Sequence, residues 1–320
     1  MARINTKRTA LFIKSGSTLP VPPANFLEAD DVVLVTPTVR VEEYKRLNGK
    51  LGANDAYADT CDTTFEGSIA HKMRFQNSAA DALDTVPEYG ELLKIGGFTE
   101  TINTATPGQE TVTYENTQNP VLGSAVAYMD DNKQTMTGSL ACDLTFSFEI
   151  GMAAKIEASL SAFFDNNGIA TSEANPTVDL SDEGCLLVGC ADVTTAGGTT
   201  IEPSNISIAM NSEISKFYGM GLKEYQLTDY KPELTVDFYP DNANYNDAIT
   251  ALANQTAETI VIKLGTNNGT MVSGKSVEIQ VTNCKYKSYS DSDDQGSIKR
   301  SVTYMFTADS AFTIKHGYFA

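Results

Sequence analysis

The chain has no tryptophan, only two histidines and far fewer basic than acidic residues. Its 320 residues include 23 Lys or Arg against 41 Asp or Glu, so the formal net charge is −18. A surface this acidic repels phosphate groups, which argues against ordinary DNA or RNA binding and against contact with anionic membranes. The lack of tryptophan removes the commonest side chain on which proteins stack sugars.

Long apolar runs are also missing. No stretch of about 18 apolar residues occurs, and the opening MARINTKRTALFIKSG lacks the apolar segment of a signal peptide. We therefore expect a protein made and used in a cytosol-like compartment, without a membrane partner. The cysteines are odd in number and scattered, which favours reduced thiols. They are Cys61, Cys142, Cys185, Cys190 and Cys284.

One stretch, GTMVSGKS at residues 269–276, fits the phosphate-binding pattern G-x-x-x-x-G-K-[ST]. Such a site needs a helix directly after the lysine, because the amides and dipole at the helix N-terminus hold the phosphate. The next residues, 277–281, are VEIQV, in which branched and polar residues alternate as in a strand. We therefore interpret the stretch as a connection between two strands.

Other constellations give no catalytic or metal site. No G-x-S-x-G turn occurs, His71 is in phase with apolar neighbours as a core histidine would be, and His316 has no evident partner. Cys185 and Cys190 would fall on opposite faces of a strand, which does not suit a metal pair. The stretch DSDDQGS, residues 291–297, lacks the closing glutamate of a calcium loop and favours a solvated acidic turn. The sequence thus predicts no enzyme, no cofactor and no metal.

The hydrophobic pattern predicts a mainly β fold with few helices, of the α+β class. Apolar residues occupy every even position from 140 to 150, and 154–164 continues in the same way. Similar alternation occurs at 65–75, 234–238, 260–264, 277–281 and 298–306. Only two segments are expected to be helical, 85–97 and 241–255.

The two expected helices indicate an internal repeat. Each follows a strand and precedes several more, and they lie roughly 155 residues apart, a typical domain length. We therefore expect a tandem duplication. The predicted division is an N-terminal arm at 1–20, a first β domain at 21–165, a linker or loop at 166–200 and a second β domain at 201–320.

Three stretches carry a resemblance to a known family. They are 29–53 (ADDVVLVTPTVRVEEYKRLNGKLGA), 87–116 (PEYGELLKIGGFTETINTATPGQETVTYEN) and 136–165 (MTGSLACDLTFSFEIGMAAKIEASLSAFFD). Their order resembles the tail tube, or major tail, proteins of siphophages, and is most similar to those of transposable and prophage-like siphophages and gene transfer agents. The resemblance implies a β-sandwich or half-barrel flanked by a helix.

The resemblance also implies a structural role in the virion tail, with assembly in the host cytoplasm. Rings of this family present six tube domains, so a duplicated chain implies a trimeric ring with pseudo-sixfold symmetry. A hexamer is the alternative if the second half is a decoration. The rings would stack into a tube through which the tape measure protein and DNA pass, with tail terminator and distal tail proteins at its ends.

Within that family role, Glu149 and Asp237 are candidates for a negative lumen wall along which DNA slides. The segment 47–63 is rich in small residues and would order on the adjacent ring, or is simply a loop. Four basic residues stand without an acid among them near the N-terminus, and they predict an arm that docks on an acidic neighbour, or a frayed terminus. They are Arg3, Lys7, Arg8 and Lys14.

Two other classes compete with the tube protein. A β-sandwich adhesin or carbohydrate-binding module would fit strands rich in Ser, Thr and Asn, although the missing tryptophan counts against it. A nucleotide enzyme would rest on residues 269–276 alone. An adhesin should stay monomeric or bind glycans, a tube protein should form rings, and a nucleotide enzyme should be protected by nucleotide against heat.

Overall fold

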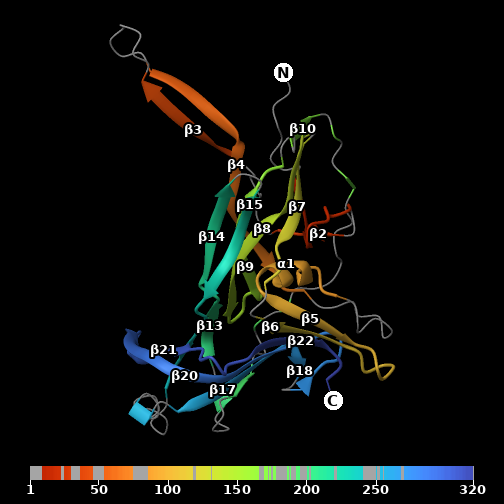
Figure 1. Ribbon diagram of the computed structural model, residues 1–320. Coiled ribbons are helices and arrows are strands. Elements are labelled where there is room, and N and C mark those ends of the chain that lie inside the picture. The colour runs from red at the N-terminus through yellow and green to blue at the C-terminus, as the bar shows by residue number, and fades with distance from the viewer. Residues whose placement is uncertain are drawn as a thin grey trace.

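The structure is a computed structural model, shown in Figure 1. It describes residues 9–22, 25–29, 37–45, 54–74, 86–117, 120–130, 132–165, 169–171, 173, 176–177, 186, 188, 192–194, 200–201, 203–219, 222–240, 250, 253–254, 256–267 and 270–319.

The fold is mainly β, as the alternating pattern predicts. The helix is α1 (Gly90–Ile95). The strands are β1 (Thr9–Ser15), β2 (Phe26–Leu27), β3 (Thr38–Lys45), β4 (Asn54–Lys72), β5 (Phe98–Asn103), β6 (Thr111–Asn116), β7 (Gly123–Met129), β8 (Asn132–Glu149), β9 (Lys155–Phe163), β10 (Ile169–Thr171), β11 (Asp192–Thr194), β12 (Thr200–Ile201), β13 (Pro203–Ala209), β14 (Ser212–Gly219), β15 (Leu222–Tyr230), β16 (Glu233–Phe238), β17 (Ala257–Leu264), β18 (Thr266–Asn267), β19 (Thr270–Met271), β20 (Val277–Asp294), β21 (Ser297–Met305) and β22 (Phe312–Gly317).

The long strand β8 joins two parts of the sheet. Its first half pairs with β7 on one side and with β10 on the other. Its second half pairs with β9, and from Thr145 onward also with β13. The Asp165 amide donates to the Thr135 carbonyl at 3.0 Å, so the chain stays along the same side of β8 from β9 to β10. Strands β7 and β13 therefore both lie on the opposite side of β8.

The second long strand, β20, has the same number of residues as β8, 18. Its first half lies between β17 and β22. At Lys285 it pairs with Ala257 of β17 and with Met305 of β21, so these two strands lie on opposite sides of it. Beyond Lys285, β20 pairs only with β21 among the described strands.

A continuous ladder connects the two halves of the chain. Its strands follow in the order β3, β4, β9, β8, β13, β16, β21 and β20, each antiparallel to the next. The strands β22, β6 and β5 extend it from β20, and β1 and β2 extend it from β7. In Figure 1 the β3–β4 hairpin projects from one end of the molecule, and β20 and β21 lie toward the other.

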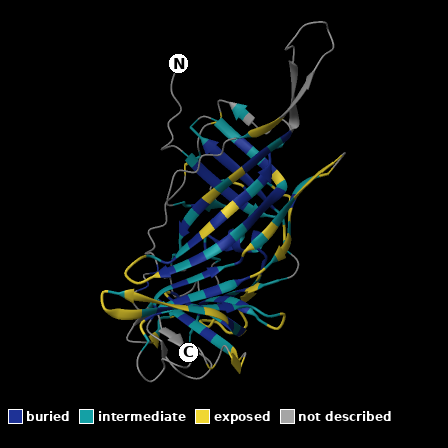
Figure 2. Cartoon of the chain, turned by 90° about the vertical axis from the view of Figure 1, so that its left-hand side faces the viewer, coloured by how far each residue is buried: buried dark blue, intermediate teal, exposed yellow. Residues whose placement is uncertain are grey.

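The period-two pattern determines which face of this sheet forms the core. Figure 2 shows buried positions alternating with partly or fully exposed ones along the strands. On β8 the buried face carries Leu144, Phe146 and Phe148, each at most 1% exposed. Helix α1 covers this face, where the Cys142 thiol donates to the Leu92 carbonyl. Burying the alternate apolar side chains is the main term that holds the two halves together.

Of the helix predicted at 85–97, residues 90–95 are helical, whereas Val86 to Tyr89 are not. The helix stops before Gly97, which takes a positive φ of 94°. Most of the second predicted helix, 241–255, lies outside the described residues. Of that segment the structure describes Thr250, Ala253 and Asn254, all helical.

Three other sequence expectations need correction. Lys14 lies in β1, opposite Ser124 of β7, so from Thr9 onward the expected arm is part of the chain's own sheet. The apolar run that follows Thr9 explains this, because it buries against the core. The expected loop at 47–63 is a strand from Asn54 onward, since pairing with β3 satisfies its backbone polar groups. Within 166–200 the structure describes β10, β11 and β12.

Candidate functional site

The two acids expected to line a lumen lie in one row of the sheet. Glu149 of β8 is opposite Asn205 of β13, which is opposite Asp237 of β16. Directly opposed residues point to the same face of a sheet. The structure thus brings Glu149 and Asp237 to one face, and this face is the one opposite the core.

The charges of these two acids are held differently. Glu149 is exposed at the end of its strand. Asp237 is half-buried, and its Oδ2 lies 3.4 Å from Nζ of Lys299 on β21. The lysine offsets much of the Asp237 charge, so Glu149 contributes more to the field over this end of the sheet than Asp237 does.

Small hydroxyl side chains are concentrated in part of this polar face. One row contains Ser147, Ser207, Thr235 and Thr303 on four successive strands. Across it the Thr235 and Thr303 hydroxyls lie 3.4 Å apart. Lys155 lies opposite Ser147 on the same face. The face therefore combines this hydroxyl row with charges of both signs, and its acidity is local.

One end of the polar face is covered by the β14–β15 hairpin. Tyr225 is 4% exposed, and its ring centroid lies 5.0 Å from that of Phe163 on β9. Its hydroxyl donates to Glu66 Oε1 at 3.2 Å. The Ser212 amide donates to Asp143 Oδ1 at 2.8 Å, and this bond fixes the start of the hairpin over β8.

A salt bridge adds to this docking. Lys216 Nζ lies 2.6 Å from Oδ1 of Asp62, which is 4% exposed, and 5.2 Å from the centroid of the Phe163 ring. A buried carboxylate needs such a partner, because an unpaired charge is costly away from water. The hairpin of the second half is therefore held on the sheet of the first half by an ion pair, hydrogen bonds and an aromatic cluster.

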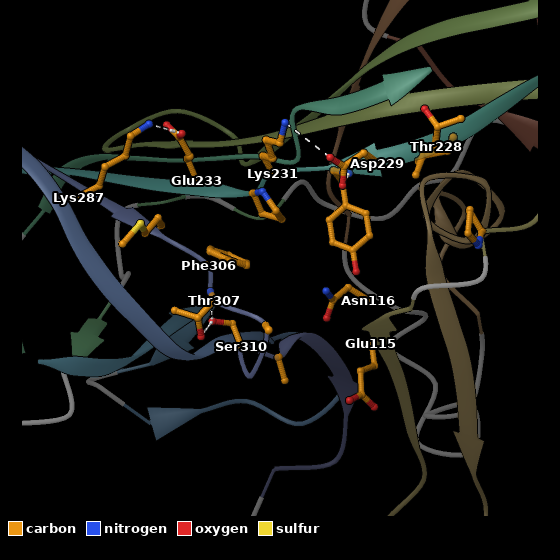
Figure 3. A pocket seen from close by; sticks show the side chains of 17 residues that line it. Glu115, Asn116, Thr228, Asp229, Lys231, Glu233, Lys287, Phe306, Thr307 and Ser310 are labelled. Atoms are coloured by element: carbon orange, nitrogen blue, oxygen red, sulfur yellow. Dashed lines mark hydrogen bonds and ion pairs between the residues drawn. The ribbon is translucent and has the colours of Figure 1, made fainter. Parts of the chain in front are cut away.

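A groove with a volume of about 740 Å³ is lined mainly by residues of the second half, together with Glu115, Asn116 and Pro120 of the first. Its walls come from the end of β15, the start of β16, the β21–β22 connection and the end of β6 (Figure 3). Lys287 forms an ion pair with Glu233 in one wall. Phe306 and Met305 supply apolar surface, and the Thr307 and Ser310 hydroxyls lie 3.2 Å apart.

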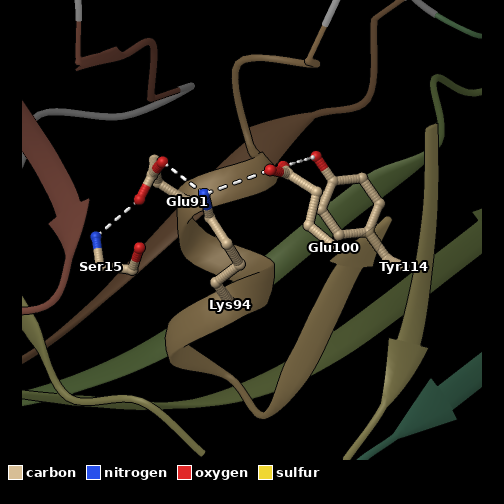
Figure 4. Close-up of polar contacts among 5 residues, drawn as sticks. All are labelled: Ser15, Glu91, Lys94, Glu100 and Tyr114. Carbon is tan, nitrogen blue, oxygen red and sulfur yellow. Dashed lines mark hydrogen bonds and ion pairs between the residues drawn. The ribbon is translucent and has the colours of Figure 1, made fainter. Parts of the chain in front are cut away.

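Helix α1 is fixed by a network of polar contacts (Figure 4). The Ser15 amide donates to Glu91 Oε2 at 2.6 Å, and Lys94 Nζ lies 2.6 Å from Glu91 Oε1 and 3.6 Å from Glu100 Oε1. Burial alone would raise the pKa of Glu91, but the hydrogen bonds from Lys94 and Ser15 outweigh it and leave that pKa lowered. The Tyr114 hydroxyl donates to Glu100 at 2.8 Å. This network joins β1, α1, β5 and β6.

Both histidines are fully buried beside this helix. His71 is a core histidine as predicted, and its Nδ1 lies 2.6 Å from the Glu28 carbonyl oxygen. His316 does have a partner, because its Nε2 lies 3.0 Å from the Tyr89 hydroxyl. Burial lowers the pKa of His316 to about 3, so the ring is neutral at neutral pH. The sequence could not reveal this contact, since the two residues are 227 positions apart.

The rejected motifs have structural roles. Ser276 accepts a hydrogen bond from the Val272 amide at 2.8 Å and donates to the Gly265 carbonyl at 2.5 Å, and β20 follows at once. No helix follows the lysine, as the sequence predicts. The expected acidic turn at 291–297 belongs to strand β20 as far as Asp294, because it pairs with β21 there, and Asp291 binds buried Arg300 through two bonds of 2.7 and 2.9 Å. Cys185 and Cys190 lie outside the described residues, as do Arg3, Lys7 and Arg8.

Within the described ranges, no cluster of His, Cys, Asp and Glu has the geometry to hold a metal ion. In the same part of the chain, no helix is long and apolar enough to cross a membrane. No protein-family model matches the chain, and no curated protein matches its sequence.

Proposed function

We propose that this chain is a structural protein that assembles into stacked rings and forms the tail tube of a siphophage virion, a conduit for the tape measure protein and DNA. The observation that carries the proposal is the pairing of β8 with β13, which joins two similar sheets edge to edge within one chain. A joint of this kind can be repeated between chains to close a ring.

The strand order supports a tandem duplication. In the first half β9 lies between β4 and β8, and β7 pairs with the first half of β8. In the second half β21 lies between β16 and β20, and β17 pairs with the first half of β20. Helix α1 follows β4, and the described helical residues between 250 and 254 follow β16. Under this proposal β8 and β20 are counterparts.

The edge of β20 supports ring closure. Strand β8 pairs through one edge with β13, and the counterpart of that edge is the β17 side of β20 beyond Lys285. This edge of β20 has no partner strand among the described residues. An unpaired edge of this length invites pairing with another chain. A ring of three copies would contain six such units, and a hexamer would follow if the second half were a decoration instead.

The polar face suits the lumen of such a tube. The row of Ser147, Ser207, Thr235 and Thr303 carries no charge that could hold a phosphate backbone, and the net charge of −18 repels DNA. Glu149 would then contribute directly to the negative wall, and Asp237 less so because Lys299 lies beside it. Tail terminator and distal tail proteins would cap the ends.

Native mass spectrometry across a range of protein concentrations tests this proposal. The tube function predicts a closed species of three subunits, followed by multiples of it. The β-sandwich adhesin is the competing function, and it predicts a monomer at every concentration that binds immobilised glycans. A monomer with glycan binding would replace the proposal with the adhesin.

A further inference from the structure

The groove beside Glu233 and Lys287 occupies the same relative position in the second half as the covered surface does in the first. In the first half Glu66, Ser161 and Ala141 are directly opposed across β4, β9 and β8. In the second half Glu233, Met305 and Lys285 are opposed across β16, β21 and β20.

The first of these surfaces is filled by the β14–β15 hairpin. Tyr225 contacts Glu66 there, and Ala141 packs in one buried cluster with Tyr225 and Phe163. Two residues beyond Ser161 is Phe163, and two residues beyond Met305 is Thr307, which lines the groove. The surface that is closed in the first half is therefore open in the second.

The β3–β4 hairpin is the counterpart of the hairpin that closes the first surface. The β14–β15 hairpin follows β13 and precedes β16 in the chain, and it projects beyond the sheet that these two strands form. In the same way, the paired β3 and β4 project beyond the part of β4 that pairs with β9. Both ladders shift register near their base, between Glu213 and Ile214 in one and between Val39 and Arg40 in the other.

This hairpin cannot fill the groove of its own chain. In Figure 1 it projects from one end of the molecule, whereas β21, whose end lines the groove, lies toward the other end. We propose that the groove receives the β3–β4 hairpin of a second copy of this chain, in the way that the first half receives β14–β15.

This inference rests on the proposed ring. If the β8–β13 joint is repeated between chains, the β20 edge pairs with the next copy, and the β3–β4 hairpin of that copy then lies over the groove. The hairpin would cover the apolar surface of Met305 and Phe306 and surround the ion pair of Lys287 and Glu233. Excluding water from such a pair strengthens it.

Site-specific photocrosslinking tests the contact. A photoreactive amino acid is placed at Ala308, which is exposed in the groove, and for comparison at Thr104 on the exposed β5–β6 turn. Full-length chains, half of them isotopically labelled, are mixed, assembled and irradiated, and the crosslinked peptides are sequenced. From position 308 we expect crosslinks between differently labelled chains to peptides within residues 38–59, and none to them from position 104.

A second variant measures the energetic contribution. Ala308→Arg should raise the concentration needed for half-maximal assembly by about tenfold or more, because it fills the groove with a charged side chain. Thr104→Arg adds the same charge outside the groove and should leave that concentration unchanged. Rings that form normally in the Ala308→Arg variant, or rings whose crosslinks from 308 avoid residues 38–59, would overturn the inference and leave the proposed function standing. A protein that forms no rings would overturn both.

Discussion

Replacing Tyr225 with alanine should detach the β14–β15 hairpin from the sheet while the rest of the fold persists. The side chain is 4% exposed, packs on Phe163 and donates a hydrogen bond to Glu66. Truncating a buried aromatic residue costs about 3–5 kcal/mol. The hydrogen bond accounts for about 1 kcal/mol of this. The matched variant Tyr225→Phe keeps the ring and should lose only that smaller part.

Hydrogen exchange followed by mass spectrometry measures this loss locally. A cost of about 3 kcal/mol corresponds to roughly 100-fold faster exchange through local opening. We expect that acceleration in β14 and β15 of the alanine variant, about fivefold in the phenylalanine variant, and little change in β16. Equal exchange of the hairpin in all three proteins would show that Tyr225 does not hold it, and would remove the template for hairpin docking between copies.

The same residue gives this docking a pH dependence. Burial and the neighbouring Glu66 carboxylate raise the pKa of Tyr225 to about 12, against the effect of a hydrogen bond with Thr64. A pKa raised in the folded state means that the neutral phenol is favoured there. The contribution is therefore complete below about pH 10 and is lost as the pH rises toward 12. As the pH rises above about 10, ionisation of Tyr225 should accelerate hydrogen exchange in β14 and β15 of the unmodified protein. The Tyr225→Phe variant should lack this part of the acceleration.

Three further substitutions, with Gly219→Ala as a control for the first, test the packing and the buried polar groups. A Cβ at Gly96 would lie 2.2 Å from Leu144 Cδ1, so Gly96→Ala should lower the free energy of unfolding by about 1–3 kcal/mol in urea titrations. Gly219→Ala meets no atom within 4 Å and should not. The pKa of His316 is lowered to about 3 in the folded state, so its contribution to the free energy of unfolding is present above about pH 6.5. That contribution declines as the pH falls toward 3, at up to about 1.4 kcal/mol per pH unit. The free energy of unfolding of His316→Gln should therefore change less steeply with pH in this range. Asp291→Asn removes the negative charge and one of the two acceptor oxygens that bind a buried guanidinium, and should cost on the order of 1–3 kcal/mol. Thermal denaturation measures this cost, and an unchanged midpoint would contradict that role.

Local patterns in the sequence were sufficient to predict some of the strands, β8 and β9 among them, and the position of helix α1. The alternation from 140 to 150 identifies the buried face of β8 because side chains in a strand point to opposite faces in turn. The paired glycines after Ile95 identify the end of α1 because a helix commonly stops at a residue with positive φ. Both signals depend only on residues that are close in the chain.

Contacts between distant residues could not be predicted in this way. The pairing of Glu149 with Asn205 depends on which strand edges meet, and period-two patterns do not specify the partner. Arg300 of β21 is 1% exposed because Asp291 and the ring of Tyr289 surround it, whereas an arginine without a known partner is expected to be solvated. The length of β4 was missed for the same reason, since its small polar residues become a strand only through pairing with β3.

Negative-stain electron microscopy of the purified protein over a range of concentrations tests the ring assembly most directly. The tail tube function predicts hollow rings with sixfold appearance that stack into tubes as the concentration rises, with three chains in each ring. Particles that remain single chains at every concentration, without rings or tubes, would contradict it.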